Sequence, residues 1–375
     1  MTHFNVPQGE YNLLRYPVRK KDNLRAWDAA DEYLLNFLAE HKCDYASTLI
    51  INDSFGALSI ALAEHQPTMW SDSYLSQQGT QNNLANNALS SKLVRLINSL
   101  EEPEGIISLV LIKIPKSLAH LEDQLHRLKN HINSNTTIIA AGMVKSIHTS
   151  TLDLFTSIIG ETTTSRAQKK ARLIFCTPDK NTPLSSSPYP TRYKLENTSF
   201  TFSNHASVFS RQSLDIGTRF FIEHIPTDND AKQIVDAGCG NGVVGIIAAE
   251  RNPEAMITFI DESYMAIASA KDNFTNAFNN TRQAEYHVTD CLKDMNNESV
   301  DLILINPPFH QHNAVGDSTA WQMFKESRDV LKKSGEIWVI GNRHLDYHTK
   351  LKRLFGNYVN VASNKKFVIL KAIKR

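Results

Sequence analysis

Cysteine is scarce in this chain of 375 residues, which contains four. No two of them form a Cys-x-x-Cys pair, so the sequence argues against a disulfide framework or a zinc knuckle and favours free thiols in a reducing cytoplasm. The four are Cys43, Cys176, Cys239 and Cys291. We therefore expect no structural disulfide and no bound metal.

Long hydrophobic runs are also missing. The longest, around residues 106–114, spans about ten residues and contains Lys113, whereas a transmembrane helix needs about 20. The first ten residues, MTHFNVPQGE, lack the basic and apolar regions of a secretory signal. The sequence therefore predicts a cytoplasmic protein with no membrane partner.

Net charge is nearly absent, with 40 basic and 39 acidic residues, so the total charge indicates no particular partner. The distribution is uneven, however. Residues 351–375 contain seven basic side chains and no acidic one, and residues 165–194 contain seven basic side chains and one acidic one. Two such segments could contact the phosphates of a nucleic acid or simply be solvated faces, and the charges alone do not separate the two.

A linker is predicted at residues 178–194, PDKNTPLSSSPYPTRYK, which contain four prolines and three consecutive serines. It separates residues 1–177 from residues 195–375, and each part is long enough to bury its own core. In the second part, short apolar strands alternate with helices, which predicts a doubly wound α/β domain with a parallel sheet. The expected strands are 233–236, 256–261, 285–289, 300–305, 336–340 and 367–372, and the expected helices include 242–250 and 264–278.

A glycine-rich loop follows the first of these strands, in the segment IVDAGCGNG at residues 234–242. Glycines at such a point let the backbone turn tightly and approach a ligand closely. Val243 stands where a dinucleotide fingerprint has its third glycine, which disfavours NAD and leaves a purely structural turn as the alternative. The predicted ligand-binding positions are Asp236, Gly238, Gly240 and Gly242.

Two further acids stand at the ends of the next two strands. Asp261 is placed to accept hydrogen bonds from ribose hydroxyls, and Asp290 to accept one from an adenine amine. Taken singly, each acid is more often a helix cap than a ligand. Taken together, the acids at the ends of three successive strands outline one crevice at the carboxyl edge of the sheet.

The fourth strand runs into Asn306-Pro307-Pro308-Phe309, and these four are the predicted catalytic residues. Prolines lack a backbone donor, so this turn exposes carbonyl oxygens. The Asn306 side-chain oxygen and the Pro307 carbonyl could accept both protons of a planar NH₂ group while Phe309 stacks on its ring. Two acceptors stabilise the positive charge that develops on nitrogen during alkyl transfer. Asn306 is also a predicted cofactor contact, and an ordinary proline turn is the alternative.

The order of these motifs resembles the class I S-adenosylmethionine-dependent methyltransferases, in which Asn-Pro-Pro-Phe marks enzymes that act on amines of planar groups. The surrounding segments resemble the tandem-domain ribosomal RNA guanine-N2 methyltransferases. The segments are 26–35, 52–59, 147–155, 208–221, 306–317 and 341–356. The resemblance implies S-adenosylmethionine as the cofactor and the N2 amine of a guanine in 23S rRNA as the target, with 16S rRNA as the near alternative.

Other functions remain open on the residues alone. An adenine-N6 or glutamine-N5 methyltransferase uses nearly the same turn, although those enzymes more often have Tyr at the position of Phe309. An RNA-binding assembly factor on a methyltransferase fold is the non-enzymatic alternative. His310 and Arg343 lie near the predicted crevice, and each is explained as well by solvation or a salt bridge as by substrate contact.

The first half of the chain aligns with the second as a degenerate copy. Residues 49–58 align with 233–242, which places Ser54, Gly56 and Leu58 at the positions of Gly238, Gly240 and Gly242. In the same alignment, Asp72 takes the place of Asp261. Lysines, Lys113 and Lys116, replace Asn306 and Phe309, which removes both the amine acceptor and the stacking ring. The sequence therefore predicts an internal duplication with one inactive domain.

The inactive domain has two possible roles. Lys113, Lys116 and the basic cluster at residues 166–172 favour an RNA-docking surface, but exposed lysines are common and a folding scaffold is as good an explanation. Two fused copies in one chain also lead us to expect a monomer.

Overall fold

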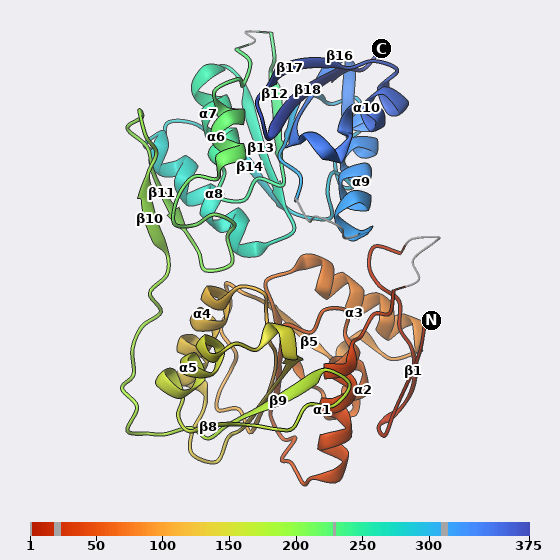
Figure 1. Ribbon diagram of the computed structural model, residues 1–375, viewed down its shortest axis with the longest axis vertical. Helices are drawn as coiled ribbons and strands as arrows, with labels where there is room; N and C mark the ends of the chain where they lie inside the picture. Colours follow the sequence, from red (N-terminus) through yellow and green to blue (C-terminus); the bar gives the residue numbers. More distant parts are fainter. Residues whose placement is uncertain (1, 19–23, 228–229, 309–313) are drawn as a thin grey trace. The chain divides into compact units, whose positions relative to one another are not determined.

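The computed structural model describes residues 2–18, 24–227, 230–308 and 314–375, without the side chains of 314–316. These residues form two compact units, Met1–Tyr189 and Pro190–Arg375 (Figure 1). Each unit begins with an antiparallel hairpin and continues into a seven-stranded mixed sheet. The hairpins are β1 (His3–Val6) with β2 (Gly9–Asn12), and β10 (Thr191–Lys194) with β11 (Thr201–Asn204). Strand β10 thus uses the last residues of the proline-rich segment 178–194.

The sheet of the second unit has the strand order β14-β13-β12-β15-β16-β18-β17. The strands are β12 (Gln233–Ala237), β13 (Met256–Asp261), β14 (Ala284–Val288), β15 (Val300–Ile305), β16 (Leu331–Asn342), β17 (Val359–Ser363) and β18 (Phe367–Ile373). The first five strands of this order are parallel, as the sequence predicts. Strand β18 is antiparallel to both its neighbours, so the prediction of an all-parallel sheet was wrong at this edge. The connection from β17 to β18, residues 364–366, is too short for a parallel crossover.

Helices cover both faces of this sheet (Figure 1). The helices on one face are α6 (Ile216–Ile222), α7 (Val243–Arg251) and α8 (Tyr264–Ala277), and those on the other are α9 (Ala314–Val330) and α10 (Tyr347–Phe355). Neighbouring residues of β15 point to opposite faces, so that Leu304 packs in the core with α7 while Ile303 packs in the core with α9. The arrangement is doubly wound, and it brings the carboxyl ends of the parallel strands to one edge.

The first unit repeats this topology with the strand order β5-β4-β3-β6-β7-β9-β8. Its strands are β3 (Thr48–Ile51), β4 (Thr68–Ser71), β5 (Arg95–Asn98), β6 (Leu109–Lys113), β7 (Thr137–Met143), β8 (Thr162–Thr164) and β9 (Ala171–Cys176). Its helices are α1 (Ala29–Glu40), α2 (Ala57–Ala61) and α3 (Tyr74–Asn86) on one face, and α4 (Leu118–Leu128) and α5 (Thr149–Ile158) on the other. The shared strand order confirms the predicted pair of Rossmann-like domains. None of the described helices has the length and apolar character needed to cross a membrane.

The strand pairing aligns the two units residue by residue. Ile51 faces Ile112 between β3 and β6, as Ala237 faces Ile305 between β12 and β15. Lys113 therefore occupies the position of Asn306, as predicted. The loops that follow Ile51 and Ala237 have equal length and end in glycine N-caps.

The same alignment corrects the predicted match of the glycine loops by two residues. Gly56 caps α2 with φ 84°, and Gly242 caps α7 with φ 80°, so these two glycines are equivalent. Gly240 therefore corresponds to Ser54, and Gly238 to Asn52. On the next strand, Trp70 pairs with Ile51 as Ile260 pairs with Ala237, so the counterpart of Asp261 is Ser71 and not Asp72.

A conserved pattern of side-chain contacts supports this corrected alignment. Asn83 on α3 donates its amide to the carbonyl of Phe55 at 2.9 Å, and Asn273 on α8 donates to the carbonyl of Asn241 at 3.0 Å. Phe55 and Asn241 each precede the capping glycine. Each asparagine also donates to a backbone carbonyl at the end of its unit's hairpin, that of Leu14 just after β2 or that of Ser203 within β11. The loop geometry is therefore common to both units, and what differs is the chemistry placed on it.

Candidate active site

The three loop glycines of the second unit all have left-handed backbone conformations, but for different reasons. A Cβ on Gly242 would lie 2.9 Å from the Cβ and 3.0 Å from the Cα of Ala270, so packing of α7 against α8 requires a glycine there. A Cβ on Gly240 would meet nothing within 4 Å, and one on Gly238 only the end of Met323 at 3.5 Å. The space at Gly240 is therefore open to a ligand.

The first unit, the degenerate copy, distinguishes the glycine needed for packing from the glycines that leave space for a ligand. It keeps Gly56, where a Cβ would lie 2.9 Å from the side chain of Thr80, and thus keeps the glycine that packing requires. It has lost the other two glycines, since Asn52 and Ser54 stand in their places. Asn52 still has a positive φ of 64°. The two glycines that the first unit lacks are those whose counterparts, Gly238 and Gly240, have room for a Cβ in the second unit. Packing does not require them there, which points to a ligand as the reason for their presence.

Asp236 fixes the shape of the loop. Its side chain is buried, and Oδ2 accepts a hydrogen bond from the Gly245 amide at 2.8 Å. Burial raises the pKa of Asp236 to about 7, with the charge of Asp261 acting in the same direction. In the first unit, Asp53 makes the equivalent contact with the helix that follows the loop: its Oδ2 accepts from the amide and hydroxyl of Ser59, each at 2.8 Å.

Asp261 and Asp290 lie along the same edge as this loop. Asp261 accepts from the Gly240 amide through Oδ2 and from the Ser263 amide through Oδ1, each at 3.0 Å. Asp290 is buried and accepts from the side chain of Gln322 at 3.1 Å. The strand order β14-β13-β12 places the ends of their strands side by side. The structure thus brings the three predicted acids to one edge, as expected for a crevice.

Asn306 follows β15, the next strand along this edge. Its Nδ2 donates to the hydroxyl of Thr218 at 2.9 Å, whereas its Oδ1 is buried and finds no hydrogen-bond partner among the described residues. Leaving a buried acceptor unpaired costs about 1–3 kcal/mol, so this atom is a candidate to bind an external donor. Pro307 is buried and Pro308 is exposed, while Phe309 and His310 lie outside the described residues. The contact with Thr218 was not predicted.

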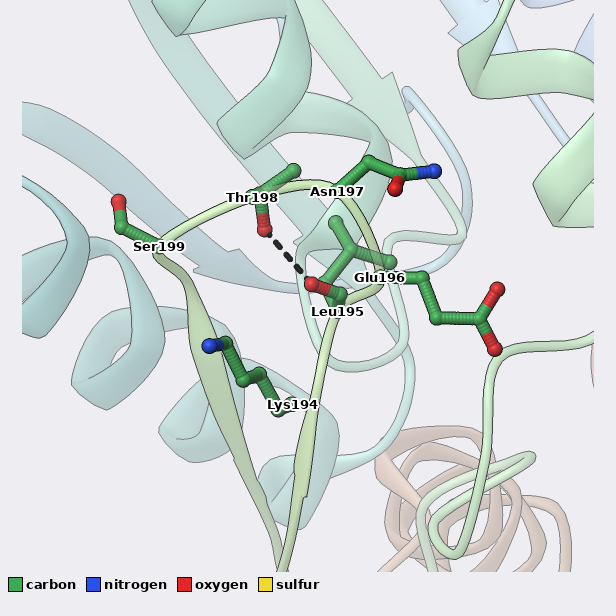
Figure 2. Close-up of a pocket in the computed structure, with 6 residues that line it drawn as sticks. All are labelled: Lys194, Leu195, Glu196, Asn197, Thr198 and Ser199. Atoms are coloured by element: carbon green, nitrogen blue, oxygen red, sulfur yellow. Dashed lines mark hydrogen bonds between the residues drawn. The ribbon is translucent and has the colours of Figure 1, made fainter.

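The remaining candidates lie elsewhere or have other partners. Arg343 donates to the carbonyl of Asn364 at 3.3 Å in an exposed setting. Figure 2 shows a pocket at the turn between β10 and β11, lined by residues 194–199, none of which is a predicted site residue. In the part of the chain that the structure describes, no cluster of three or more His, Cys, Asp or Glu side chains could hold a metal.

The equivalent site of the first unit is closed by an ion pair. The Lys113 ammonium lies 2.8 Å from Asp28 and 2.6 Å from Asp31, and 11% of its side chain is exposed. Although burial opposes its charge, these two carboxylates raise the pKa of Lys113. The Lys113 ammonium is therefore paired within its own unit, which argues against RNA docking by Lys113, and a docking role for this domain stays a prediction. Lys116 is exposed.

Comparison with known proteins places the chain in a family. Residues 1–180 match the RLMG N-terminal domain, and residues 199–371 match the Methyltransferase small domain. The chain is 49% identical to the ribosomal RNA large subunit methyltransferase G of Streptomyces griseus, with 100% of both chains covered. It is 50% identical to the protein of the same name from Aeromonas salmonicida, with 97% of both covered.

A solved structure has the same tandem fold. It is the T. thermophilus 16S rRNA N2 methyltransferase in complex with AdoMet and guanosine, which matches with a TM-score of 0.76 and 17% identity over 100% of this chain and 98% of that one. At this identity the likeness shows the fold alone. The two relatives above are 49% and 50% identical over 100% and 97% of this chain, and this identity shows the family: the protein belongs to the ribosomal RNA large subunit methyltransferase G family.

Proposed function

We propose that the protein transfers a methyl group from S-adenosylmethionine to the exocyclic N2 amine of a guanine in 23S rRNA. Family membership supports the reaction and the large-subunit substrate. The observation that carries the amine site is the buried Oδ1 of Asn306, which has no hydrogen-bond partner among the described residues and follows the strand paired with β12. A guanine N2 group has two protons to donate and is a poor nucleophile, so it needs acceptors rather than a strong base.

The residues present fit S-adenosylmethionine. This cofactor supplies an electrophilic methyl group when bound. The backbone at Gly238 and Gly240 would approach it closely because no side chain intervenes, and Gly242 would hold the loop against α8. Asp236 shapes the loop, Asp261 would accept from the ribose hydroxyls and Asp290 from the adenine amine. Asn306 borders both this cradle and the amine site.

The amine would be held at the turn after β15. The Asn306 Oδ1 and the Pro307 carbonyl accept its two protons, and this acceptance grows stronger as positive charge develops on the nitrogen. Pro308 keeps the turn free of a competing backbone donor. Phe309 would stack on the base. One amine proton leaves to water after the nitrogen–carbon bond has formed, and holding the nitrogen in line supplies much of the remaining rate.

The RNA would present this guanine unpaired or flipped out, because a base in a stacked duplex cannot enter such a site. We propose that basic residues of segments 165–194 and 351–375 contact the RNA backbone, which makes binding salt-dependent. Residues 195–375 would form the catalytic domain, residues 178–194 the linker, and residues 1–177 a scaffold or docking domain. We further propose that the protein acts in the cytoplasm as a monomer.

Methylation of purified RNA tests the reaction, the atom and the substrate together. The full-length protein is incubated with tritiated S-adenosylmethionine and unmodified 23S or 16S rRNA, and the labelled nucleosides are identified. Label in N2-methylguanosine from 23S rRNA alone is the expected result. Label from 16S rRNA alone would move the substrate to the small subunit, and label in N6-methyladenosine would overturn the guanine assignment. Cofactor binding without label in either RNA would contradict naked rRNA as the substrate.

A pair of glycine variants tests the cofactor cradle. We expect Gly240→Ala to weaken S-adenosylmethionine binding by at least about tenfold, because its methyl group enters open space, with about 1 kcal/mol of backbone strain. We expect Gly242→Ala to lower the free energy of unfolding by about 1–3 kcal/mol more than Gly240→Ala does, because its methyl group overlaps Ala270. Calorimetric titration and urea unfolding separate the two effects. Equal cofactor affinity in Gly240→Ala and wild type would contradict a ligand at Gly240.

A further inference from the structure

The side chain of Asn306 can serve an amine donor in one of its two orientations. With Oδ1 toward the substrate, the side chain accepts an amine proton. With Nδ2 toward the substrate, its own NH₂ group would face the NH₂ group of the substrate, and two donors cannot form a hydrogen bond. Rotation by half a turn about the last side-chain bond exchanges the two, at little intrinsic cost. Something in the protein must therefore select the orientation.

The contact of Asn306 with Thr218 supplies that selection. Thr218 Oγ1 lies 2.9 Å from Asn306 Nδ2, and it also lies 3.3 Å from Oδ2 of Asp215. Asp215 is the N-cap of α6, and the same oxygen accepts from the Thr218 amide at 2.9 Å. An ionised carboxylate only accepts hydrogen bonds, so the single hydroxyl proton of Thr218 points toward Asp215.

The orientation of the Asn306 side chain follows from which atoms can donate and which can accept a hydrogen bond. With its proton directed to Asp215, the Thr218 oxygen offers Asn306 a lone pair. The NH₂ end of Asn306 can use that lone pair, and the carbonyl end cannot. The carboxamide is thereby fixed with Oδ1 facing away from Thr218, where it has no partner among the residues described. Resting on the function proposed above, we propose that Asp215 and Thr218 are positioning residues that aim the Asn306 carbonyl at the guanine amine.

The degenerate unit provides an internal comparison. The N-cap and third residue of α1 are Asp28 and Asp31, the counterparts of Asp215 and Thr218. Asp31 touches Lys113, which stands in the place of Asn306. The contact between helix and strand end has persisted, and both of its members have changed together from threonine and asparagine to aspartate and lysine. In each unit the helix residue accepts a proton from the strand-end residue, which is the arrangement that the orientation argument requires.

Variants of Thr218 test the proposal. Thr218→Val keeps the shape and removes the hydroxyl, whereas Thr218→Ser keeps the hydroxyl. With 23S rRNA as substrate, we expect Thr218→Val to lower kcat by about tenfold or more while the Kd for S-adenosylmethionine stays within about twofold, and Thr218→Ser to return most of kcat. Thr198→Val is the matched control, because the Thr198 hydroxyl bonds the backbone of its own turn, donating to the Leu195 carbonyl and accepting from the Phe200 amide. Unchanged kcat in Thr218→Val, or an equal loss in Thr218→Ser, would overturn the proposal.

A second measurement does not depend on turnover. In protein labelled with ¹⁵N on asparagine, the side-chain NH₂ signals of Asn306 are assigned by their loss in Asn306→Asp. We expect slow solvent exchange of one of these protons in wild type and fast exchange in Thr218→Val. Equal exchange in the two proteins would contradict the orienting bond even if no RNA substrate were found. A wild type that fails to methylate guanine but shows this difference would overturn the proposed function and retain the orienting bond.

Discussion

Replacing Asn306 by alanine is expected to lower kcat for rRNA methylation by about 10²-fold or more, by analogy with the loss of an oxyanion-type partner. The variant loses the buried Oδ1 that has no partner among the described residues, and with it one of the two acceptors for the guanine amine. The glycine loop and the acids beside it are untouched, so the Kd for S-adenosylmethionine should stay within about threefold. Single-turnover rates and calorimetric titration of the same preparation give both quantities.

Two controls sharpen this experiment. Asn197→Ala removes an asparagine from the exposed turn drawn in Figure 2 and should leave kcat unchanged. Asn306→Asp keeps an acceptor oxygen but removes the NH₂ group that binds Thr218, so it should lower kcat even though an acceptor is still present. Near-normal turnover in Asn306→Ala would rule out the amine-holding role, and a large loss of cofactor affinity would move Asn306 into the cofactor cradle instead.

The sequence predicts the second unit well because its signals are local. The strands β12, β13 and β15 are largely apolar and each is followed by a helix, and their carboxyl ends carry acids, glycines or Asn-Pro-Pro within a few positions. Periodicity does not reveal strand β17 or the hairpins, since these are short and partly exposed. Their pairing depends on tertiary contacts that no short window of sequence contains.

The predicted alignment of the two glycine loops failed for a physical reason. Matching Gly56 to Gly240 assumes that the surviving glycine is the one nearest a ligand. The survivor is the counterpart of Gly242, because its left-handed conformation and its close approach to α3 are needed for folding whether or not a ligand binds. Loss of function removes the selection for ligand contacts and leaves the selection for packing.

Thr218 escaped prediction because its partner lies 88 residues away along the chain. A signal was nevertheless present. In the aligned halves, the third residue of a helix and the residue after the central strand differ together, as Thr218 with Asn306 and as Asp31 with Lys113. A paired change between internal copies indicates that the two positions are in contact. It becomes readable only after the copies are aligned by structure rather than by their glycines.

Replacing Lys113 by methionine is expected to lower the free energy of unfolding at pH 8 by about 3–5 kcal/mol, as when one member of a buried ion pair is removed. Asp31 has 7% of its side chain exposed and would lose its close positive partner. Asp28 is half-exposed and can recover hydration, so most of the loss comes from Asp31. Urea unfolding of the full chain, compared with the exposed-site control Lys116→Met, measures the effect.

The dependence of this loss on pH follows from the carboxyl group left behind. Burial already raises the pKa of Asp31 to about 6 from an ordinary 3.8, even with Lys113 present. Without the ammonium this pKa rises further, so the folded state of the variant takes up a proton that the unfolded state does not hold. A carboxyl whose pKa is higher in the folded than in the unfolded state loses stability as pH rises. The gap between variant and wild type should therefore widen between about pH 6 and pH 8.

A double variant separates charge from packing in the same site. Lys113→Met combined with Asp31→Leu removes both charges, and it should recover most of the lost stability and abolish the extra pH dependence, because a buried ion pair can often be replaced by apolar side chains without net cost. The single variant should also leave the KM for rRNA unchanged at temperatures where it is folded, because the Lys113 charge is held by Asp28 and Asp31. A raised KM with unaltered stability would instead mean that Lys113 leaves its carboxylates to bind RNA, so that the ion pair opens when RNA binds.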